Sequence, residues 1–271
     1  MSTARYMGGL QVVNLDSKTM KCPRAALFDL DDTLAESFQP PSSDMIEKLR
    51  ALLEHIPVVI ITAAGFKRIQ REFFEHLADS PHISRLTVFP NSAAQCYRYT
   101  DGAWNLEYNL ALSKEDRERI KTAVDEAVVE TGIIEPSEYV PAILDREVQI
   151  AFAALGLKAP LPAKEAWDPD QSKRKKLKAL LEQRIPEFEI LIGGMTTIDI
   201  TTKGVNKAYG VNYFAKRLGA KPSEMLYVGD ALYEGGNDYV VIPTGIQTRS
   251  VTGPADTLKV IDELLQVCSA Y

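Results

Sequence analysis

Short apolar runs and amphipathic segments alternate along the first third of the chain. The runs are rich in β-branched residues, which is typical of buried strands, and the segments between them carry apolar residues at helical spacing. The pattern predicts strands at Ala25–Asp29, Pro57–Thr62 and Leu86–Phe89, and helices at Ser43–Glu54 and Phe66–Leu77. Such alternation indicates a parallel sheet with helices on both faces.

The middle of the chain has a different pattern, with pairs of strands and long charged helices. A turn of the hairpin type separates strands predicted at Gln95–Tyr99 and Trp104–Tyr108. Further strands are expected at 139–144, 148–153, 189–192 and 197–201, and helices at 113–131 and 170–183. The first pattern then returns with helix 208–218, strands 225–228 and 240–243, and helix 255–267.

These patterns predict an α/β fold with two domains. We expect a Rossmann-like, parallel-sheet core formed by residues 22–94 and 204–271, and an inserted α+β domain formed by residues 95–203. The length of 271 residues is close to that at which one core divides into two.

Composition narrows the class of protein. Apolar content of 45% and charged content of 25% are ordinary for a soluble globular protein. A net charge of −6 argues against nucleic-acid binding, which needs a basic surface. We see no signal peptide in residues 1–20 and no apolar segment near the ~20 residues that a membrane helix needs.

The three cysteines are Cys22, Cys96 and Cys268. They lie far apart, and neither a disulfide framework nor the spacing of a zinc site is visible. We therefore expect reduced thiols and a cytoplasmic protein.

A cluster of acidic residues directly follows the first predicted strand. Asp29 and Asp31 are two residues apart, and Asp32 and Thr33 complete the segment. In open α/β sheets, ligands bind at this carboxyl edge. One aspartate there can attack phosphorus, a second can carry a proton, and a hard cation can bind against them.

Further polar residues stand where the same chemistry would need them. Thr62 ends the next strand, Lys207 begins a helix, and Asp230 follows strand 225–228. The carboxylates of Asp29 and Asp230 with the main-chain carbonyl of Asp31 would suit Mg²⁺. A nucleophile, cations on the phosphoryl oxygens and a proton carrier are what phosphoryl transfer requires. The alternative is that these residues only cap helices and turns.

This ordered set resembles the haloacid dehalogenase superfamily, and the size and position of the insert are similar to the large α+β cap of its sugar-phosphatase branch, subfamily IIB. Segments 88–91, 192–195, 229–238 and 250–257 are similar to the eukaryotic-type phosphomannomutases. The resemblance covers about residues 24–267. It implies a superfamily core with an inserted cap.

The resemblance also implies roles. Asp29 would become a phospho-aspartate and Asp31 would be the general acid and base, while Thr62 and Lys207 would bind the phosphoryl group. Asp230 would bind Mg²⁺, and Asp238 would support it or bind a second cation.

In the cap, Arg146, Thr197 and Asp199 match positions that hold the sugar or its distal phosphate. The alternative is an ordinary surface ion pair for Arg146 and ordinary sheet positions for Thr197 and Asp199. By analogy, a homodimer through the cap is plausible.

Three departures bear on the activity. Leu157 stands where the mutases have a second cap arginine, and the third such position falls near Lys164. Lysine lacks the planar fork with which arginine grips a phosphate. In the first motif, Asp32 replaces the mutases' usual glycine, which decides little alone.

We therefore predict a Mg²⁺-dependent phosphohydrolase that acts on a phosphorylated sugar or similar small metabolite. The alternatives are a phosphomannomutase-like phosphosugar mutase and a non-catalytic binding protein that keeps the fold.

Overall fold

The computed structural model describes residues 6–7, 10–11 and 21–269. Contacts within the chain divide it into two units, residues 1–108 with 207–271 and residues 109–206. The described residues contain no helix that is both long and apolar enough to cross a membrane. A two-stranded antiparallel sheet joins β1 (Tyr6–Met7) and β2 (Leu10–Gln11).

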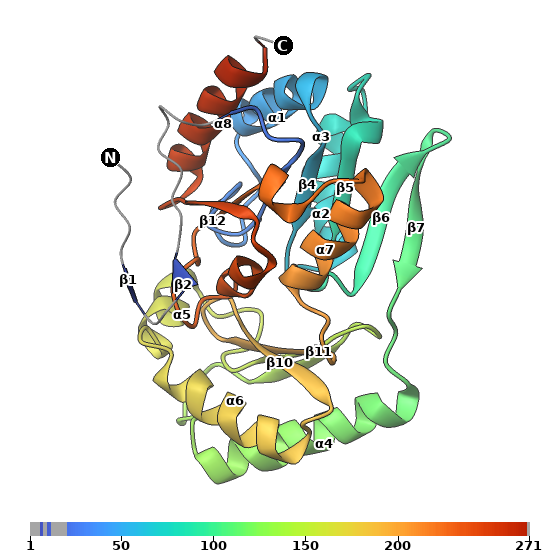
Figure 1. Cartoon of the computed structure of the whole chain (residues 1–271). Helices are drawn as coiled ribbons and strands as arrows, with labels where there is room; N and C mark the ends of the chain where they lie inside the picture. Colours follow the sequence, from blue (N-terminus) through green and yellow to red (C-terminus); the bar gives the residue numbers. More distant parts are fainter. Residues whose placement is uncertain (1–5, 8–9, 12–20, 270–271) are drawn as a thin grey trace. The chain divides into compact units, whose positions relative to one another are not determined.

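The first unit contains a seven-stranded sheet with the order β13-β12-β3-β4-β5-β6-β7 (Figure 1). Its strands are β3 (Ala26–Phe28), β4 (Val58–Ile61), β5 (Leu86–Phe89), β6 (Gln95–Thr100), β7 (Ala103–Asn109), β12 (Leu226–Gly229) and β13 (Gln247–Ser250). From β13 to β5 neighbouring strands are parallel, whereas β6 runs antiparallel to β5.

Helices cover both faces of this sheet. Because side chains alternate between faces along a strand, Phe28 and Val228 lie in one apolar cluster and Leu27 and Tyr227 in the other. The first face is covered by α1 (Ser43–His55), α2 (Phe66–Ile69), the π-helical turn η1 (Gln70–Phe74), α3 (Glu75–Leu77) and α8 (Pro254–Cys268). The second face is covered by α7 (Lys207–Leu218) and the 3₁₀ helix η4 (Tyr239–Thr244). The predicted α/β core is therefore confirmed.

Short 3₁₀ turns complete this unit, namely η2 (Ile83–Arg85) and η3 (Pro222–Glu224).

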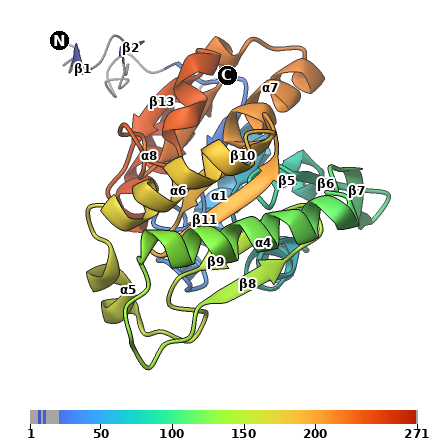
Figure 2. The ribbon, with the colours of Figure 1, turned by 90° about the horizontal axis from the view of Figure 1, so that it is seen from below.

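The second unit is a four-stranded antiparallel sheet with helices on one face. The strand order is β10-β11-β9-β8, with β8 (Ala142–Asp145), β9 (Ile150–Ala153), β10 (Phe188–Gly193) and β11 (Thr197–Thr202). The helices are α4 (Lys114–Thr131), α5 (Leu161–Trp167) and α6 (Ser172–Arg184). Figure 2 shows α4 and α6 lying along the sheet, and their apolar residues share one buried cluster with Ile198 and Ile200 of β11.

The boundary of the insert differs from the predicted one. Hairpin β6-β7 was expected in the inserted domain, but β6 pairs with β5 and extends the core sheet. Its aromatic residues pack on the helices of the first unit: Tyr97 stacks on Phe66, and Trp104 stacks on Phe74, each with ring centroids 3.6 Å apart. The second unit therefore begins at residue 109 rather than 95 and ends at 206 rather than 203.

The strand predicted at 240–243 is wrong, because this segment is the 3₁₀ helix η4. Pro243 has no N–H to donate to a sheet ladder, and Val241 and Ile242 are buried in the helical form. The strand that follows β12 in the chain is β13, whose sequence is largely polar.

The prediction of reduced thiols is also wrong for two of the three cysteines. Cys22 and Cys268 form a disulfide between residues 246 positions apart, while Cys96 is free and buried. Sequence separation concealed this pair, because the fold brings the segment before β3 to the end of α8.

Candidate active site

The candidate site lies where β3 and β12 end side by side in the core sheet. The two strands are parallel neighbours, and Asp29 continues their pairing by donating its N–H to the carbonyl of Val228 at 3.0 Å. Asp230 follows Gly229, the last residue of β12. Asp29 and Asp230, far apart in sequence, are thus positioned together by strand register.

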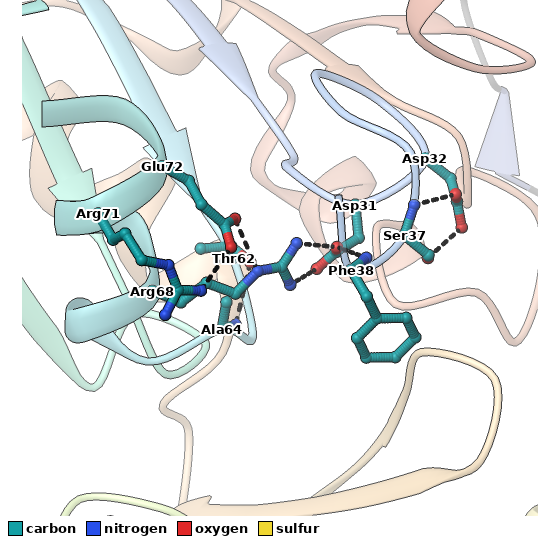
Figure 3. Close-up of polar contacts among 9 residues, drawn as sticks. All are labelled: Asp31, Asp32, Ser37, Phe38, Thr62, Ala64, Arg68, Arg71 and Glu72. Atoms are coloured by element: carbon teal, nitrogen blue, oxygen red, sulfur yellow. Dashed lines mark hydrogen bonds and ion pairs between the residues drawn. The ribbon is translucent and has the colours of Figure 1, made fainter. Parts of the chain in front are cut away.

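Thr33 ties the loop after β3 to the end of β12. Its hydroxyl oxygen accepts the N–H of Asp230 at 3.1 Å, and the hydroxyl donates to Asp230 Oδ1 at 3.1 Å. Asp32 turns the loop with a φ of 57°, and its carboxylate accepts the N–H and the hydroxyl of Ser37 (Figure 3). An aspartate tolerates this left-handed conformation better than most residues, which explains how it can replace a glycine here.

Lys207 is the cation at the centre of the site. Its Nζ lies 2.7 Å from Asp29 Oδ1 and 2.7 Å from Asp238 Oδ1. The lysine side chain is only 3% exposed, and those of Asp29 and Asp238 are 5% and 0% exposed. Lys207 therefore joins the strand-end aspartate to the loop after β12 through two buried ion pairs.

Asp238 is held from several directions. Besides Lys207, its Oδ1 accepts the phenolic hydroxyl of Tyr227 at 2.5 Å, and its Oδ2 accepts the N–H of Ala231 at 3.1 Å. Gly229 is required beside it, because a Cβ at that position would lie 2.3 Å from Asp238 Oδ2. These contacts fix Asp238 as the residue that orients Lys207.

Burial and negative charge dominate the electrostatics of the cluster. Burial raises the pKa of Asp29 well above its ordinary value; Asp238 and Asp230 act in the same direction, and Lys207 opposes them. Burial, followed by the charge of Asp238, raises the pKa of Asp230 to about 6. Burial alone would lower the pKa of Lys207, but Asp238 and Asp29 outweigh it and raise that pKa.

The cluster fits a divalent cation. Asp29, Asp230 and Asp238 each offer a carboxylate oxygen, and these oxygens all lie within 4.8 Å of one another. Three carboxylates face a single ammonium group, so the ionised cluster carries an excess of two negative charges. Hard oxygen ligands of this kind suit Mg²⁺, and such a cation would favour the ionised form of Asp29.

Thr62 follows β4 directly and is held by the backbone around it. Its N–H donates to the carbonyl of Phe89, its carbonyl accepts the N–H of Ser92, and its Oγ1 accepts the N–H of Ala64 at 3.0 Å. The side chain is buried at the carboxyl end of the sheet, so its hydroxyl is fixed in place there (Figure 3).

The carboxylate of Asp31 lies in an ion pair with Arg68. Asp31 does not belong to the cluster of carboxylates whose oxygens lie within 4.8 Å of one another. Among the described acidic residues, that cluster is formed by Asp29, Asp230 and Asp238. Figure 3 shows the Arg68 guanidinium directed at Asp31 from α2. The ion pair involves only the carboxylate of Asp31, whereas the group of Asp31 predicted to bind metal is its main-chain carbonyl.

Residues predicted to bind the sugar lie on the sheet of the second unit. Asp199 and Thr197 are on β11, on the face opposite the apolar cluster that contains Ile198 and Ile200. Both side chains gather at Gly193, where a Cβ would lie 2.2 Å from Asp199 Oδ2 and 2.7 Å from Thr197 Oγ1.

Arg146 lies in the turn between β8 and β9. It donates from Nη1 to Gln149 Oε1 at 2.7 Å, and its N–H donates to the carbonyl of Gln149.

Sequence reasoning missed four residues that hold these sites. Thr33 belonged to the recognised motif, but its bond to Asp230 depends on the pairing of β3 with β12. Tyr227 reads as an ordinary apolar strand residue, and Arg68 as a surface residue of a helix. Arg174 stands in a run of four basic residues at 173–176, yet it is buried against Asp168 and donates to the carbonyl of Gly193 at 3.3 Å.

Comparison with known proteins shows that the chain is similar in sequence to the phosphomannomutases. The eukaryotic phosphomannomutase family matches residues 162–267. The phosphomannomutase of Spinacia oleracea is 24% identical over 247 residues, which cover 88% of this chain and 94% of that protein.

Among solved structures, an IMP-bound mutant of Plasmodium falciparum IMP-nucleotidase aligns with a TM-score of 0.69 at 14% identity, covering 90% of this chain and 67% of that one. Aspergillus fumigatus trehalose-6-phosphate phosphatase aligns with a TM-score of 0.57 at 15% identity, covering 93% and 98%. At these identities the likeness shows the fold. The resemblance to the eukaryotic phosphomannomutases predicted from the motifs is therefore confirmed: the chain is similar to these enzymes in sequence, and its fold is that of the phosphatases named above.

Proposed function

We propose that the protein is a Mg²⁺-dependent phosphohydrolase acting on a phosphate monoester of a sugar or a similar small metabolite. The observation that carries this proposal is the cluster of Asp29, Asp230 and Asp238 at the carboxyl ends of β3 and β12, with the buried Lys207 paired to Asp29 and Asp238. A nucleophilic carboxylate, an adjacent cation and an acidic metal site are the parts that phosphoryl transfer needs.

The first step is attack by a carboxylate oxygen of Asp29 on phosphorus. The bond between phosphorus and the sugar oxygen breaks, and Asp31 gives its proton to that oxygen. Lys207, 2.7 Å from Asp29, offsets the negative charge of the reacting group. Thr62 would donate its hydroxyl proton to a phosphoryl oxygen.

The second step is hydrolysis of the phospho-aspartate. Asp31, now ionised, takes a proton from water while the water oxygen attacks phosphorus. The acyl phosphate bond breaks, inorganic phosphate leaves, and Asp29 is regenerated as a carboxylate. Asp29, Asp230 and the main-chain carbonyl of Asp31 would hold Mg²⁺, with support from Asp238, and the bound cation would supply positive charge against the phosphoryl oxygens.

Hydrolysis is favoured over isomerisation by the second unit. A mutase must grip a bisphosphate in two orientations, and the residue after Gly156 is Leu157, whose side chain is 63% exposed and apolar. Lys164 is buried on α5 and can offer charge, but it lacks a bidentate fork. We assign Arg146, Thr197 and Asp199 to binding of the sugar.

The second candidate is a phosphosugar mutase of the phosphomannomutase kind. It is favoured by the family match at residues 162–267, which includes the loop that carries Asp238, and by the names of the curated relatives. The two candidates share the phospho-aspartate and differ in whether water or a sugar phosphate accepts the phosphoryl group.

The experiment is to measure phosphate release from a panel of sugar phosphates, with and without Mg²⁺. The proteins are the wild type, Asp29→Asn, and the matched control Asp44→Asn, which changes an exposed aspartate of α1. Mg²⁺-dependent release by the wild type and the control, abolished in Asp29→Asn, is the expected result. Without release, the panel is repeated with a hexose bisphosphate to detect isomerisation, and inactivity in both assays refutes both candidates.

A further inference from the structure

Arg68 binds both oxygens of the Asp31 carboxylate. Its Nη1 donates to Oδ2 at 2.9 Å and its Nη2 to Oδ1 at 2.7 Å, and Oδ1 also accepts the N–H of Phe38 at 3.3 Å (Figure 3). The guanidinium carbon also lies 5.9 Å from the centre of the Phe38 ring. A guanidinium fork of this kind is geometrically specific for a carboxylate. Asp31 is thus held by a planar group that leaves neither oxygen free of a charged donor.

A buried glutamate holds Arg68 in this orientation. Arg68 Nε donates to Glu72 Oε2 at 2.8 Å, four residues along the same helical segment, and the Glu72 side chain is only 7% exposed. Arg71 binds the other oxygen of Glu72 from the solvent side, at 2.8 Å, with 70% of its side chain exposed. Glu72 therefore occupies the Nε edge of Arg68, and the two Nη groups are directed at Asp31.

The helical segment that carries Arg68 is anchored in the core. Ile69, Phe73 and Phe74 are buried beneath it, and it passes from α-helix through a π-helical turn at Gln70–Phe74. Such turns are rare and often occur at functional sites. Because this segment is fixed by packing, the pair separates through the loop that bears Asp31 or through rotation of the two side chains.

These contacts conflict with the chemistry expected of Asp31. A general acid or base must bring an oxygen within hydrogen-bonding reach of the reacting atom. In the observed arrangement both oxygens are directed into the Arg68 fork, and Asp31 is not among the clustered acidic residues around Lys207. Asp31 must leave the fork before it can exchange a proton with the leaving oxygen or with water.

We propose that Arg68 is a positioning residue that holds Asp31 in an inactive orientation, so that release from the fork limits hydrolysis of the phospho-aspartate. This inference rests on the proposed function and adds to it a control on the second step. While Asp31 is held, a phospho-aspartate lacks the base that activates water. The intermediate therefore persists longer than it would with an unrestrained Asp31.

The test uses p-nitrophenyl phosphate, whose coloured product separates the two steps. A burst of p-nitrophenol reports formation of the phospho-enzyme, and the steady rate reports its hydrolysis. Arg68→Gln is expected to raise the steady rate and KM together about fivefold, the factor that about 1 kcal/mol corresponds to, with the burst rate constant and kcat/KM nearly unchanged. Arg68→Lys, which keeps the charge but not the fork, should fall between Arg68→Gln and the wild type.

Arg71→Gln is the matched control, because Arg71 also binds Glu72 but does not contact Asp31. It should leave both phases unchanged. A fall in the steady rate in Arg68→Gln, of the kind expected for Asp31→Asn, would overturn the proposal, because Arg68 would then hold Asp31 in its working orientation.

A second measurement does not depend on turnover. Thermal unfolding of Asp31→Asn, Arg68→Gln and the double variant forms a cycle that detects the ion pair directly. If the wild type turns over substrate but the effects of the two substitutions on stability are simply additive, the positioning role of Arg68 is refuted and the proposed function is not. Coupling without turnover of any phosphate ester would refute the proposed function, and the catalytic role of the pair with it.

Discussion

Replacing Lys207 by methionine tests the charge balance of the candidate site. The lysine ammonium is the cation within 2.7 Å of both Asp29 and Asp238, and all three side chains are at most 5% exposed. Methionine keeps most of the apolar stem and removes the charge. The carboxylates of the buried Asp29 and Asp238 and of the half-buried Asp230 would then lie close together without the ammonium that offsets them.

The expected cost is large at neutral pH. Removing one partner of a buried ion pair typically destabilises a protein by about 3–5 kcal/mol. Proton uptake limits this cost, because burial already raises the pKa of Asp29 and raises that of Asp230 to about 6. Each pKa unit corresponds to about 1.4 kcal/mol. We therefore expect a loss of about 3 kcal/mol at pH 7.5 and of no more than about half that at pH 5.

The assay is urea unfolding followed by the fluorescence of Trp104. The chain has two tryptophans, Trp104 in the first unit and Trp167 in the second, so a Trp167→Phe background reports the unit that holds the site. Lys259→Met is the matched control, because that lysine lies on α8 in the first unit, is 75% exposed and lies 3.6 Å from Asp256. It should change the free energy of unfolding by less than about 0.5 kcal/mol.

Two results would refute this reasoning. A loss below about 1 kcal/mol in Lys207→Met at pH 7.5 would mean that the ammonium does not offset the buried carboxylates. A loss that stayed the same at pH 5 would mean that no carboxylate of the cluster takes up a proton in its place. In either case the electrostatic basis of the Mg²⁺ site would fail.

Two further predictions follow from buried charges. Because the pKa of Asp230 is raised to about 6, the metal-free protein should gain stability as the pH falls through 6 toward the ordinary aspartate pKa, and lose it as the pH rises. Mg²⁺ competes with the proton on Asp230. The rise in Tm caused by Mg²⁺ should therefore be large at pH 7.5, weak at pH 5 and absent in Asp230→Asn. In the second unit, Arg174 donates to Asp168 Oδ2 at 2.8 Å, and both side chains are at most 4% exposed, so Arg174→Met should lower the free energy of unfolding in urea by about 3–5 kcal/mol. Lys173→Met removes an ion pair with the exposed Glu135 and should lower it by less than about 1 kcal/mol. Equal effects of the two variants would contradict the described burial.

The core of the fold could be predicted because its signals are local. The runs at Val58–Ile61 and Leu86–Phe89 are apolar on both faces, as buried parallel strands require. Asp29, Thr62 and Asp230 end or follow such strands, so their arrangement at one edge follows from the parallel sheet itself.

What could not be predicted depends on contacts between distant segments. The hairpin at 95–109 has the same local pattern whether it joins the core or the insert, and its place is decided by stacking of Tyr97 on Phe66 and of Trp104 on Phe74. The apolar segment 240–243 resembles a strand in composition, and only Pro243 argues against it. The Cys22–Cys268 bond likewise joins the two ends of the described core.

The same distinction applies within the site. A motif identifies which residues have the right chemistry, but not which partners hold them. Asp31 and Asp238 are both acidic residues of recognised motifs, yet Arg68, which holds Asp31, and Tyr227, which helps to hold Asp238, belong to no motif. Asp238 accepts bonds from Lys207, Tyr227 and the N–H of Ala231, and so fixes the cation of the site.

Which of the two candidate activities the enzyme has therefore depends on whether water or a sugar phosphate reacts first with the phospho-aspartate. A hydrolase needs Asp31 free to activate water, and a mutase needs the intermediate to survive until a sugar phosphate accepts the phosphoryl group. The Arg68 fork acts on that choice by restraining Asp31, whereas Leu157 acts on it by weakening the grip on a second phosphate. Because the two features oppose each other, an Arg68→Gln variant should shift the balance toward hydrolysis, while a Leu157→Arg variant should extend the time that a bisphosphate stays bound.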